Sequence, residues 1–298
     1  MNEPERSFSF RPRRSCLYMP GSNARAMEKA RSISADVIIL DLEDAVAADA
    51  KETARAAVCE AVSGEGFGHR EVVIRINAPS TPWGADDLTQ AAAARPDALL
   101  APKVTSGADI KAIDEAMSAA GAPVDMALWV MIEMPLAILN IAEIAAVAND
   151  TRLCAFVMGT NDLAKELRAQ PGPYRQAFQT ALQITVAAAR AHGLSAIDGV
   201  YNDIENAAGL EQECKQGRML GFDGKTLIHP AQLEICNRIF APSAEEISQA
   251  KAVIAAFADP ANAGQGVITV GGKMTELLHL EEARRVAAVA DAIAQLTD

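Results

Sequence analysis

The sequence predicts an α/β fold, a (β/α)8 TIM barrel followed by a C-terminal helical extension. Its 298 residues, half of them apolar, are enough to form one large barrel domain. Eight short apolar runs follow one another along the chain, and Ala-rich segments with helical periodicity stand between them. Alternating strands and helices of this kind form a parallel sheet covered by helices. Eight such units in about 240 residues favour a closed barrel.

The expected strands read as near-continuous apolar segments, which is typical of parallel strands buried on both faces. In chain order they are 15–20, 37–42, 72–77, 98–104, 127–133, 153–160, 195–201 and 221–229. The clearest expected helices lie at 51–62, 169–193 and 201–218. An open doubly wound sheet is the alternative. Such sheets usually carry a GxGxxG turn after the first strand, and the segment PGSNARAME does not match it.

Two domains are predicted, a catalytic barrel over residues 1–240 and an extension over residues 241–298. The extension reads as a helix at 243–260, a glycine-rich turn at 262–274 and a final helix at 277–296. A barrel does not need this piece for closure. We therefore expect a lid over the site or an arm exchanged between subunits.

Composition restricts the possible partners and location. The net charge of −12 would repel nucleic acid and anionic membranes, so we expect neither as a partner. Five scattered cysteines without a CxxC pair favour reduced thiols. The polar N-terminus does not resemble a secretory signal, and no apolar run is long enough to span a bilayer. We expect a soluble, cytoplasmic protein.

Polar side chains gather at the carboxyl ends of the expected strands, where barrel enzymes place their chemistry. Taken singly, each is explained by a strand emerging into water. Their coincidence over successive strands favours a site. In chain order they are Asp41, Glu43, Asp44, Arg75, Asn77, Lys103, Glu133 and Asp162.

Several carboxylates at one end of a barrel repel one another unless a cation lies among them. The sequence offers oxygen ligands here and no His-rich or Cys-rich cluster, which favours Mg²⁺, with Mn²⁺ as an alternative. Glu133 and Asp162 are the expected metal ligands, because each stands at a strand end with a helix behind it. The other acids would hold water molecules around the metal, and two basic residues would add positive charge: Asp41, Glu43, Asp44, Arg75 and Lys103.

These segments also carry a family resemblance. The motifs RSCLYMPGSNARAMEKA, DVIILDLEDAV, RINAPSTPWGADDL, APKV, MIEMP, MGTNDLA, AIDGVYNDIENAAGL and GFDGKTLIHPAQ together resemble the HpcH/HpaI aldolase superfamily. The likeness is greatest to the citrate lyase beta-subunit-like branch, with its malyl-CoA and citramalyl-CoA lyases. It extends over about residues 13–290, in the right order.

The resemblance implies a homo-oligomeric Mg²⁺-dependent carbon–carbon lyase, a trimer or hexamer. Such an enzyme cleaves a short 3-hydroxyacyl-CoA into an acyl-CoA and a 2-oxo acid. It implies that Glu133 and Asp162 bind the metal and that Arg75 binds the carbonyl or enolate oxygen. We expect Asn77 and Lys103 to contact the substrate as well. Basic residues around the first strand are expected to meet the CoA phosphates, although a surface charge cluster explains them equally: Arg11, Arg13, Arg14, Arg25 and Lys29.

The tail departs from the family pattern. CoA lyases of this branch carry an Asp in a motif resembling GKMVDxP, which the neighbouring subunit supplies as the base, whereas this chain reads GGKMTELLH with Glu276 there. The longer side chain leaves alternatives open. They are a thioesterase acting on the same substrates, an aldolase acting on free hydroxy-oxo acids, and a partner-dependent subunit of the citrate lyase beta type.

Overall fold

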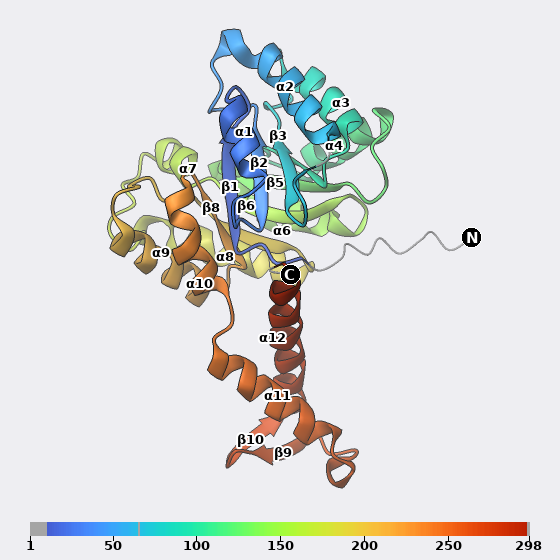
Figure 1. The fold of residues 1–298 in the computed structure, drawn as a ribbon, viewed down its shortest axis with the longest axis vertical. Coiled ribbons are helices and arrows are strands. Elements are labelled where there is room, and N and C mark those ends of the chain that lie inside the picture. The colour runs from blue at the N-terminus through green and yellow to red at the C-terminus, as the bar shows by residue number, and fades with distance from the viewer. Residues whose placement is uncertain (1–10, 65, 297–298) are drawn as a thin grey trace, which may run out of the picture. The chain divides into compact units, whose positions relative to one another are not determined.

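The computed structural model describes residues 11–64 and 66–296, and it confirms the predicted barrel. Eight parallel strands close on themselves, each paired with the next in sequence and β8 paired with β1 (Figure 1). Their bounds lie within three residues of the predicted ones. They are β1 Ser15–Pro20, β2 Val37–Asp41, β3 Glu71–Arg75, β4 Ala98–Ala101, β5 Ala127–Ile132, β6 Leu153–Met158, β7 Ser195–Asp198 and β8 Gly224–Leu227.

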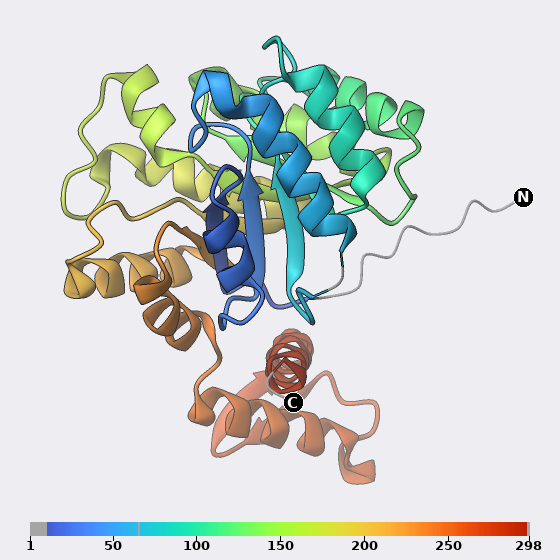
Figure 2. The ribbon, with the colours of Figure 1, turned by 45° about the horizontal axis from the view of Figure 1, so that its top comes forward.

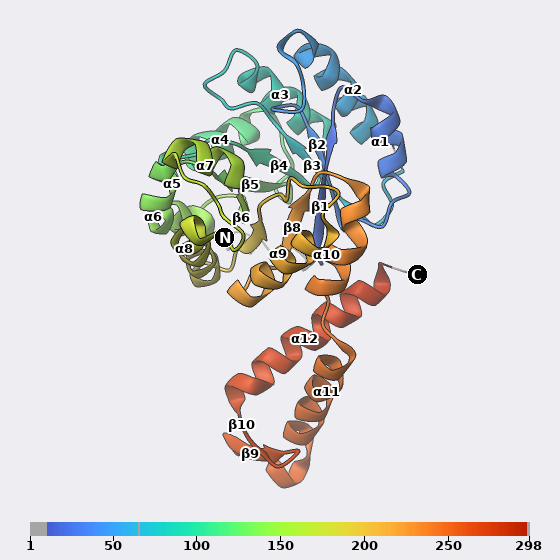
Figure 3. The same cartoon turned by 90° about the vertical axis from the view of Figure 1, so that its left-hand side faces the viewer.

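Helices surround the strands on the outside of the barrel (Figures 2 and 3). The first half contributes α1 Ala24–Ala30, α2 Lys51–Ser63, α3 Gly84–Ala94, α4 Gly107–Ala119, α5 Pro135–Leu139 and α6 Ile141–Ala146. The second half contributes α7 Thr160–Leu167, α8 Gln179–Ala191, α9 Ala207–Leu220 and α10 Leu233–Phe240. Among the described helices, none is long and apolar enough to cross a bilayer.

Two predicted helices are shorter than expected. The stretch 169–193 is helical only from Gln179, after a 3-10 turn at Gln176–Phe178. Pro171, Gly172 and Pro173 precede it, and prolines disfavour helix in the residue before them. The stretch 201–218 becomes helical at Ala207, where the Asn206 side chain caps the helix by accepting a hydrogen bond from the N–H of Gly209.

The interior of the barrel is filled by side chains and is not a pore. A buried cluster includes Ile39, Val73, Leu100 and Val157, which come from four strands, and it surrounds the fully buried Trp129 of β5. Because side chains fill the interior, a site has to lie at an end of the barrel. Barrel enzymes use the carboxyl end of the strands, which is called here the barrel mouth.

The chain divides into two compact units, and the division falls inside α10, at Arg238. In the second unit α11 (Ala244–Ala258) packs beside α12 (Leu277–Gln295), as Figures 1 and 3 both show. Between them the glycine-rich segment is an antiparallel hairpin of β9 (Val267–Val270) and β10 (Lys273–Glu276), so the prediction of a simple turn was wrong. Gly271 and Gly272 have φ of 56° and 77°, the conformation that a tight two-residue hairpin turn requires.

Candidate active site

Arg75 lies at the end of β3 and is held rigidly by Asp41 at the end of β2. The two residues are direct partners in the register of the parallel strands. Arg75 Nε and Nη2 each donate to one oxygen of Asp41, both at 2.7 Å. Asp41 also accepts the backbone N–H groups of Glu43 and Ala45. Asp41 therefore orients the guanidinium, and its oxygens are not directed to metal-bound water as we had expected.

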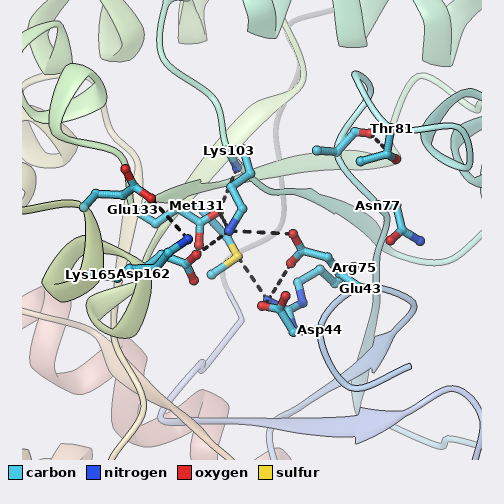
Figure 4. A network of polar contacts seen from close by, with 12 residues as sticks. Glu43, Asp44, Arg75, Asn77, Thr81, Lys103, Met131, Glu133, Asp162 and Lys165 are labelled. Atoms are coloured by element: carbon cyan, nitrogen blue, oxygen red, sulfur yellow. Dashed lines mark hydrogen bonds and ion pairs between the residues drawn. The ribbon is translucent and has the colours of Figure 1, made fainter. Parts of the chain in front are cut away.

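The third nitrogen of Arg75, Nη1, faces the barrel mouth. It lies 2.9 Å from Glu43 Oε2 and 3.5 Å from Asp44 Oδ2 (Figure 4). The guanidinium stacks 4.8 Å from the ring centre of Tyr18. Glu43 is buried, whereas Asp44 is exposed. Arg75 therefore supplies part of the positive charge near Asp41, Glu43 and Asp44.

A second cation near these acids was missed in the sequence. Lys51, the first residue of α2, is buried and donates to the backbone carbonyls of Leu42 at 2.8 Å and Glu43 at 2.6 Å. Its ammonium also lies 5.5 Å from the ring centre of Trp83. Lys51 fixes the loop after β2, and a lysine at the start of an ordinary amphipathic helix gave no signal of this role.

Lys103, which follows β4, faces the acids of three other strand ends. Its ammonium donates to Asp162 Oδ1 at 2.5 Å and lies 3.7 Å from Glu133 Oε1 and 3.9 Å from Glu43 Oε1 (Figure 4). Its backbone N–H donates to Glu133 Oε1 at 2.7 Å. Burial by itself lowers the pKa of Lys103, but the hydrogen bond to Asp162 and the neighbouring carboxylates raise it above its usual value. The lysine is charged at neutral pH.

The residues present fit a hard cation at Glu133 and Asp162. Glu133 is fully buried, and its Oε2 has no hydrogen-bond partner among the described residues. A buried carboxylate oxygen without a partner is costly unless a cation or donor reaches it. Gly159 makes room for this group, because a Cβ there would lie 2.4 Å from Glu133 Cβ and 2.6 Å from Oε2. Burial raises the pKa of Glu133, and Lys103 opposes the rise.

The number of protein ligands is small. Within the described ranges, no three His, Cys, Asp or Glu side chains are arranged to hold a metal ion together. Two carboxylates supplemented by water and substrate oxygens are the usual coordination of Mg²⁺ in enzymes. The geometry suits an ion shared between protein and substrate.

The barrel mouth contains a cavity of about 300 Å³. Its wall includes Tyr18 and Arg75 on one side and Asp162 on the other. Asn161 and Asn202 border it and join the loops after β6 and β7 through paired amide hydrogen bonds of 2.7 and 3.2 Å. Tyr18 and Asn202 were missed as site residues because neither carries a charge, although both lie in segments that carry the family resemblance.

The side chains of two predicted substrate contacts are bound by other groups of the protein. The amide nitrogen of Asn77 donates to Leu42 O at 2.8 Å and to Asp87 Oδ2 at 2.6 Å, so its donors are used within the protein. Arg14 precedes β1 and therefore lies at the amino end of the barrel, where it forms a bidentate pair with Asp36. Strand direction alone separates Arg14 from the site.

The other basic candidates lie either before β1, at the amino end of the barrel, or on the helix that follows it. Arg13 also precedes β1, pairs with Glu71 and stacks over Trp129 at the amino end. Arg25 and Lys29 are exposed on α1, the helix that follows β1. The role of Lys29 as a contact for CoA phosphate stays a prediction, whereas the side chains of Arg13 and Arg14 pair with acids at the amino end of the barrel.

Glu276 lies in the second unit, where β10 meets α12. Its backbone N–H donates to Nδ1 of His279 at 2.9 Å, and the residue is partly exposed. Glu276 is the N-cap residue of α12.

Glu43 should make the stability of the metal-free protein depend on pH. Burial raises its pKa from 4.5 to about 8, and Arg75 only partly opposes the rise. Between these values the unfolded chain ionises while the folded protein keeps the proton, so the unfolding free energy falls as pH rises, by about 2–4 kcal/mol. Glu43→Gln should remove this part of the fall. Urea unfolding of both proteins at pH 5 and pH 8 measures it, and identical pH dependences would contradict it.

Comparisons with known proteins agree with this geometry. The family model for HpcH/HpaI aldolase/citrate lyase matches residues 14–230. The chain is 51% identical to the (3S)-malyl-CoA thioesterase of Cereibacter sphaeroides (strain ATCC 17029), covering 95% of this chain and 96% of that one. It is 34% identical to citrate lyase subunit beta of Escherichia coli (strain K12), over 93% and 92% of the two chains.

Among solved structures, the chain resembles CitE from Mycobacterium tuberculosis in complex with magnesium, acetoacetate and coenzyme A. The TM-score is 0.75, with 28% identity over 93% of this chain and 97% of that one. The family match covers every strand of the barrel and each of the strand ends that build the site. The chain therefore belongs to the HpcH/HpaI aldolase/citrate lyase family.

Proposed function

We propose that this protein is a Mg²⁺-dependent thioesterase that hydrolyses a short 3-hydroxyacyl-CoA of the malyl-CoA type. The observation that carries the proposal is the 51% identity to a (3S)-malyl-CoA thioesterase over nearly the whole chain. The barrel mouth supports it with a charged donor, Arg75, and a pair of acids suited to Mg²⁺, Glu133 and Asp162. We had expected a carbon–carbon lyase first, and the relatives move the preference to hydrolysis.

Hydrolysis requires a donor to the thioester oxygen and an acceptor for a proton of water. Arg75 Nη1 offers a permanently charged N–H to the carbonyl oxygen, where negative charge develops as water attacks. Glu43 Oε2 lies 2.9 Å from Nη1, and the ionised form of Glu43, which predominates above its pKa of about 8, is placed to take the proton. Bound at Glu133 and Asp162, magnesium supplies positive charge that polarises substrate oxygens. The C–S bond then breaks, releasing the CoA thiol and the hydroxy acid.

The test is to incubate the purified protein with (3S)-malyl-CoA and Mg²⁺, with EDTA as the control. Free thiol and 2-oxo acid are followed in the same tube. Thiol without oxo acid supports the thioesterase. Oxo acid without thiol, with acetyl-CoA formed, would refute it in favour of a lyase.

A carbon–carbon lyase is the second candidate, favoured by the similarity to citrate lyase subunit beta and by the partly exposed acid Glu276. In a lyase, Glu276 from a neighbouring subunit would remove the hydroxyl proton as the carbon–carbon bond breaks. Glu276→Ala should then lower oxo-acid release about 100- to 10,000-fold.

A matched control is Glu281→Ala, which removes an exposed acid from the same helix. Equal oxo-acid rates in the two variants would exclude Glu276 as the base. If the enzyme is a thioesterase that uses Glu43, thiol release should survive the loss of Glu276.

A further inference from the structure

Lys103 lies in the space that a metal ion between Glu133 and Asp162 would share. Its ammonium contacts Asp162 Oδ1 at 2.5 Å and lies within 4 Å of Glu133 and Glu43. These three carboxylates come from the ends of β2, β5 and β6, so three separate parts of the barrel converge on one cation. The lysine neutralises part of the charge that a metal would otherwise balance.

The backbone is built to hold the lysine there. Lys103 has φ of 58°, the left-handed region that non-glycine residues rarely adopt. In this conformation its N–H donates to Glu133 Oε1 while its side chain reaches Asp162. A strained backbone that satisfies two metal-ligand candidates at once indicates a functional position.

An ammonium and Mg²⁺ cannot both hold the same oxygens, because like charges at contact distance repel and Asp162 Oδ1 is already occupied. Metal binding therefore requires the ammonium to move. It has room to do so: Lys103 also lines a second cavity, of about 610 Å³, between α3 and α4. Pro79, Ser80 and Pro102 border the same cavity close to the lysine.

We propose that Lys103 is the resident cation of the metal-free site, which Mg²⁺ displaces and which then binds the carboxylate end of the substrate. This inference rests on the proposed function for the nature of the substrate. Two consequences follow from the competition. Lys103 weakens Mg²⁺ binding to the free protein, and it strengthens the binding of an anionic ligand once the metal is in place.

The first test is calorimetric titration of Mg²⁺ into the metal-free protein without any CoA compound. Lys103→Met should bind Mg²⁺ about tenfold more tightly than the wild type, because the competing charge is gone. Lys165→Met is the matched control, since Lys165 stands on the same helix as Asp162 but is exposed and pairs with Glu166. The control should bind Mg²⁺ like the wild type.

The second test is titration of malate into the Mg²⁺-saturated proteins. Lys103→Met should bind malate about tenfold more weakly, because one charged contact is lost. Tighter metal with weaker malate is a pair of opposite shifts that general damage to the site would not produce. Equal or weaker Mg²⁺ affinity in Lys103→Met would overturn the displacement. Equal malate affinity would overturn the role in substrate binding.

Two further variants guard against misfolding. Lys103→Gln is neutral but keeps hydrogen-bond donors, and it should reproduce the gain in Mg²⁺ affinity. Lys103→Arg keeps the charge and should leave Mg²⁺ binding weak, and a tenfold gain there would overturn the electrostatic argument. Neither titration uses a CoA ester. A failure of the proposed function would therefore appear separately, as a wild type that binds Mg²⁺ but releases no thiol from malyl-CoA.

Discussion

Arg75→Lys should lower kcat/KM for the CoA substrate about 100- to 1000-fold while the protein remains folded. The nitrogens of the guanidinium have two roles: Nε and Nη2 donate to Asp41, and Nη1 faces the barrel mouth. A lysine has a single nitrogen and cannot do both. The expected loss is that of one preorganised donor to a developing oxyanion. Steady-state kinetics measures it, and a thermal melt checks the fold.

Arg152→Lys is the matched control for this prediction. Arg152 is also a buried arginine paired with an aspartate, Asp114, but it lies at the amino end of β6, opposite the site. It should cost stability and leave kcat/KM unchanged. If Arg75→Lys stayed within fivefold of the wild type, or if both variants lost activity equally, Arg75 would not be the donor.

The barrel could be predicted because most of its parallel strands are buried and read as apolar runs, as VIILD in β2 and LCAFVM in β6 do. The hairpin of the extension could not be recognised as easily. Its strands have only four residues each, and β10 reads KMTE, which is mostly polar. Val267 and Met274 are exposed, so the pair does not read as two buried strands. The Gly271–Gly272 pair was the available signal.

For the site, the sequence predicted which residues lie together but not how they pair. The rule that chemistry lies at strand ends brought Arg75, Lys103, Glu133 and Asp162 into one place, and the structure does bring these side chains together. The sequence could not tell which acid pairs with which base. That depends on strand register, which sets Asp41 opposite Arg75, and on loop geometry, which turns Asn77 toward Asp87.

Lys225 lies in a segment that resembles a functional motif, but its contacts in the structure are structural. In the sequence it stands in GKT, which resembles the end of a phosphate-binding loop, although Met219 occupies the position of the first glycine. In the structure it is fully buried in β8. Its ammonium donates to Asp198 at 3.2 Å, Glu213 at 2.6 Å and the carbonyl of Gly199 at 2.5 Å. All three of its donors are used, so none is left for a phosphate.

Lys225→Met should lower the free energy of unfolding by about 3–5 kcal/mol, since removing one member of a buried ion cluster leaves the others without compensation. Asp198 would lose one of its two cations and keep Arg175, at 2.6 Å, and the backbone N–H of Gly199, at 2.8 Å. Burial disfavours its charge, and Lys225 and Arg175 hold the pKa of Asp198 below its usual value. Urea unfolding at neutral pH measures the loss.

Lys215→Met provides the comparison, because Lys215 lies on α9 with Glu213 but is exposed and pairs with Glu211 one turn away. An exposed pair of this kind contributes less than about 1 kcal/mol. The stability lost with each lysine should thus depend on how deeply the lysine is buried, because both pair with acidic side chains. If the two variants lost the same stability, or Lys225→Met lost less than 1 kcal/mol, the buried ion cluster around Lys225 would not be a main source of stability.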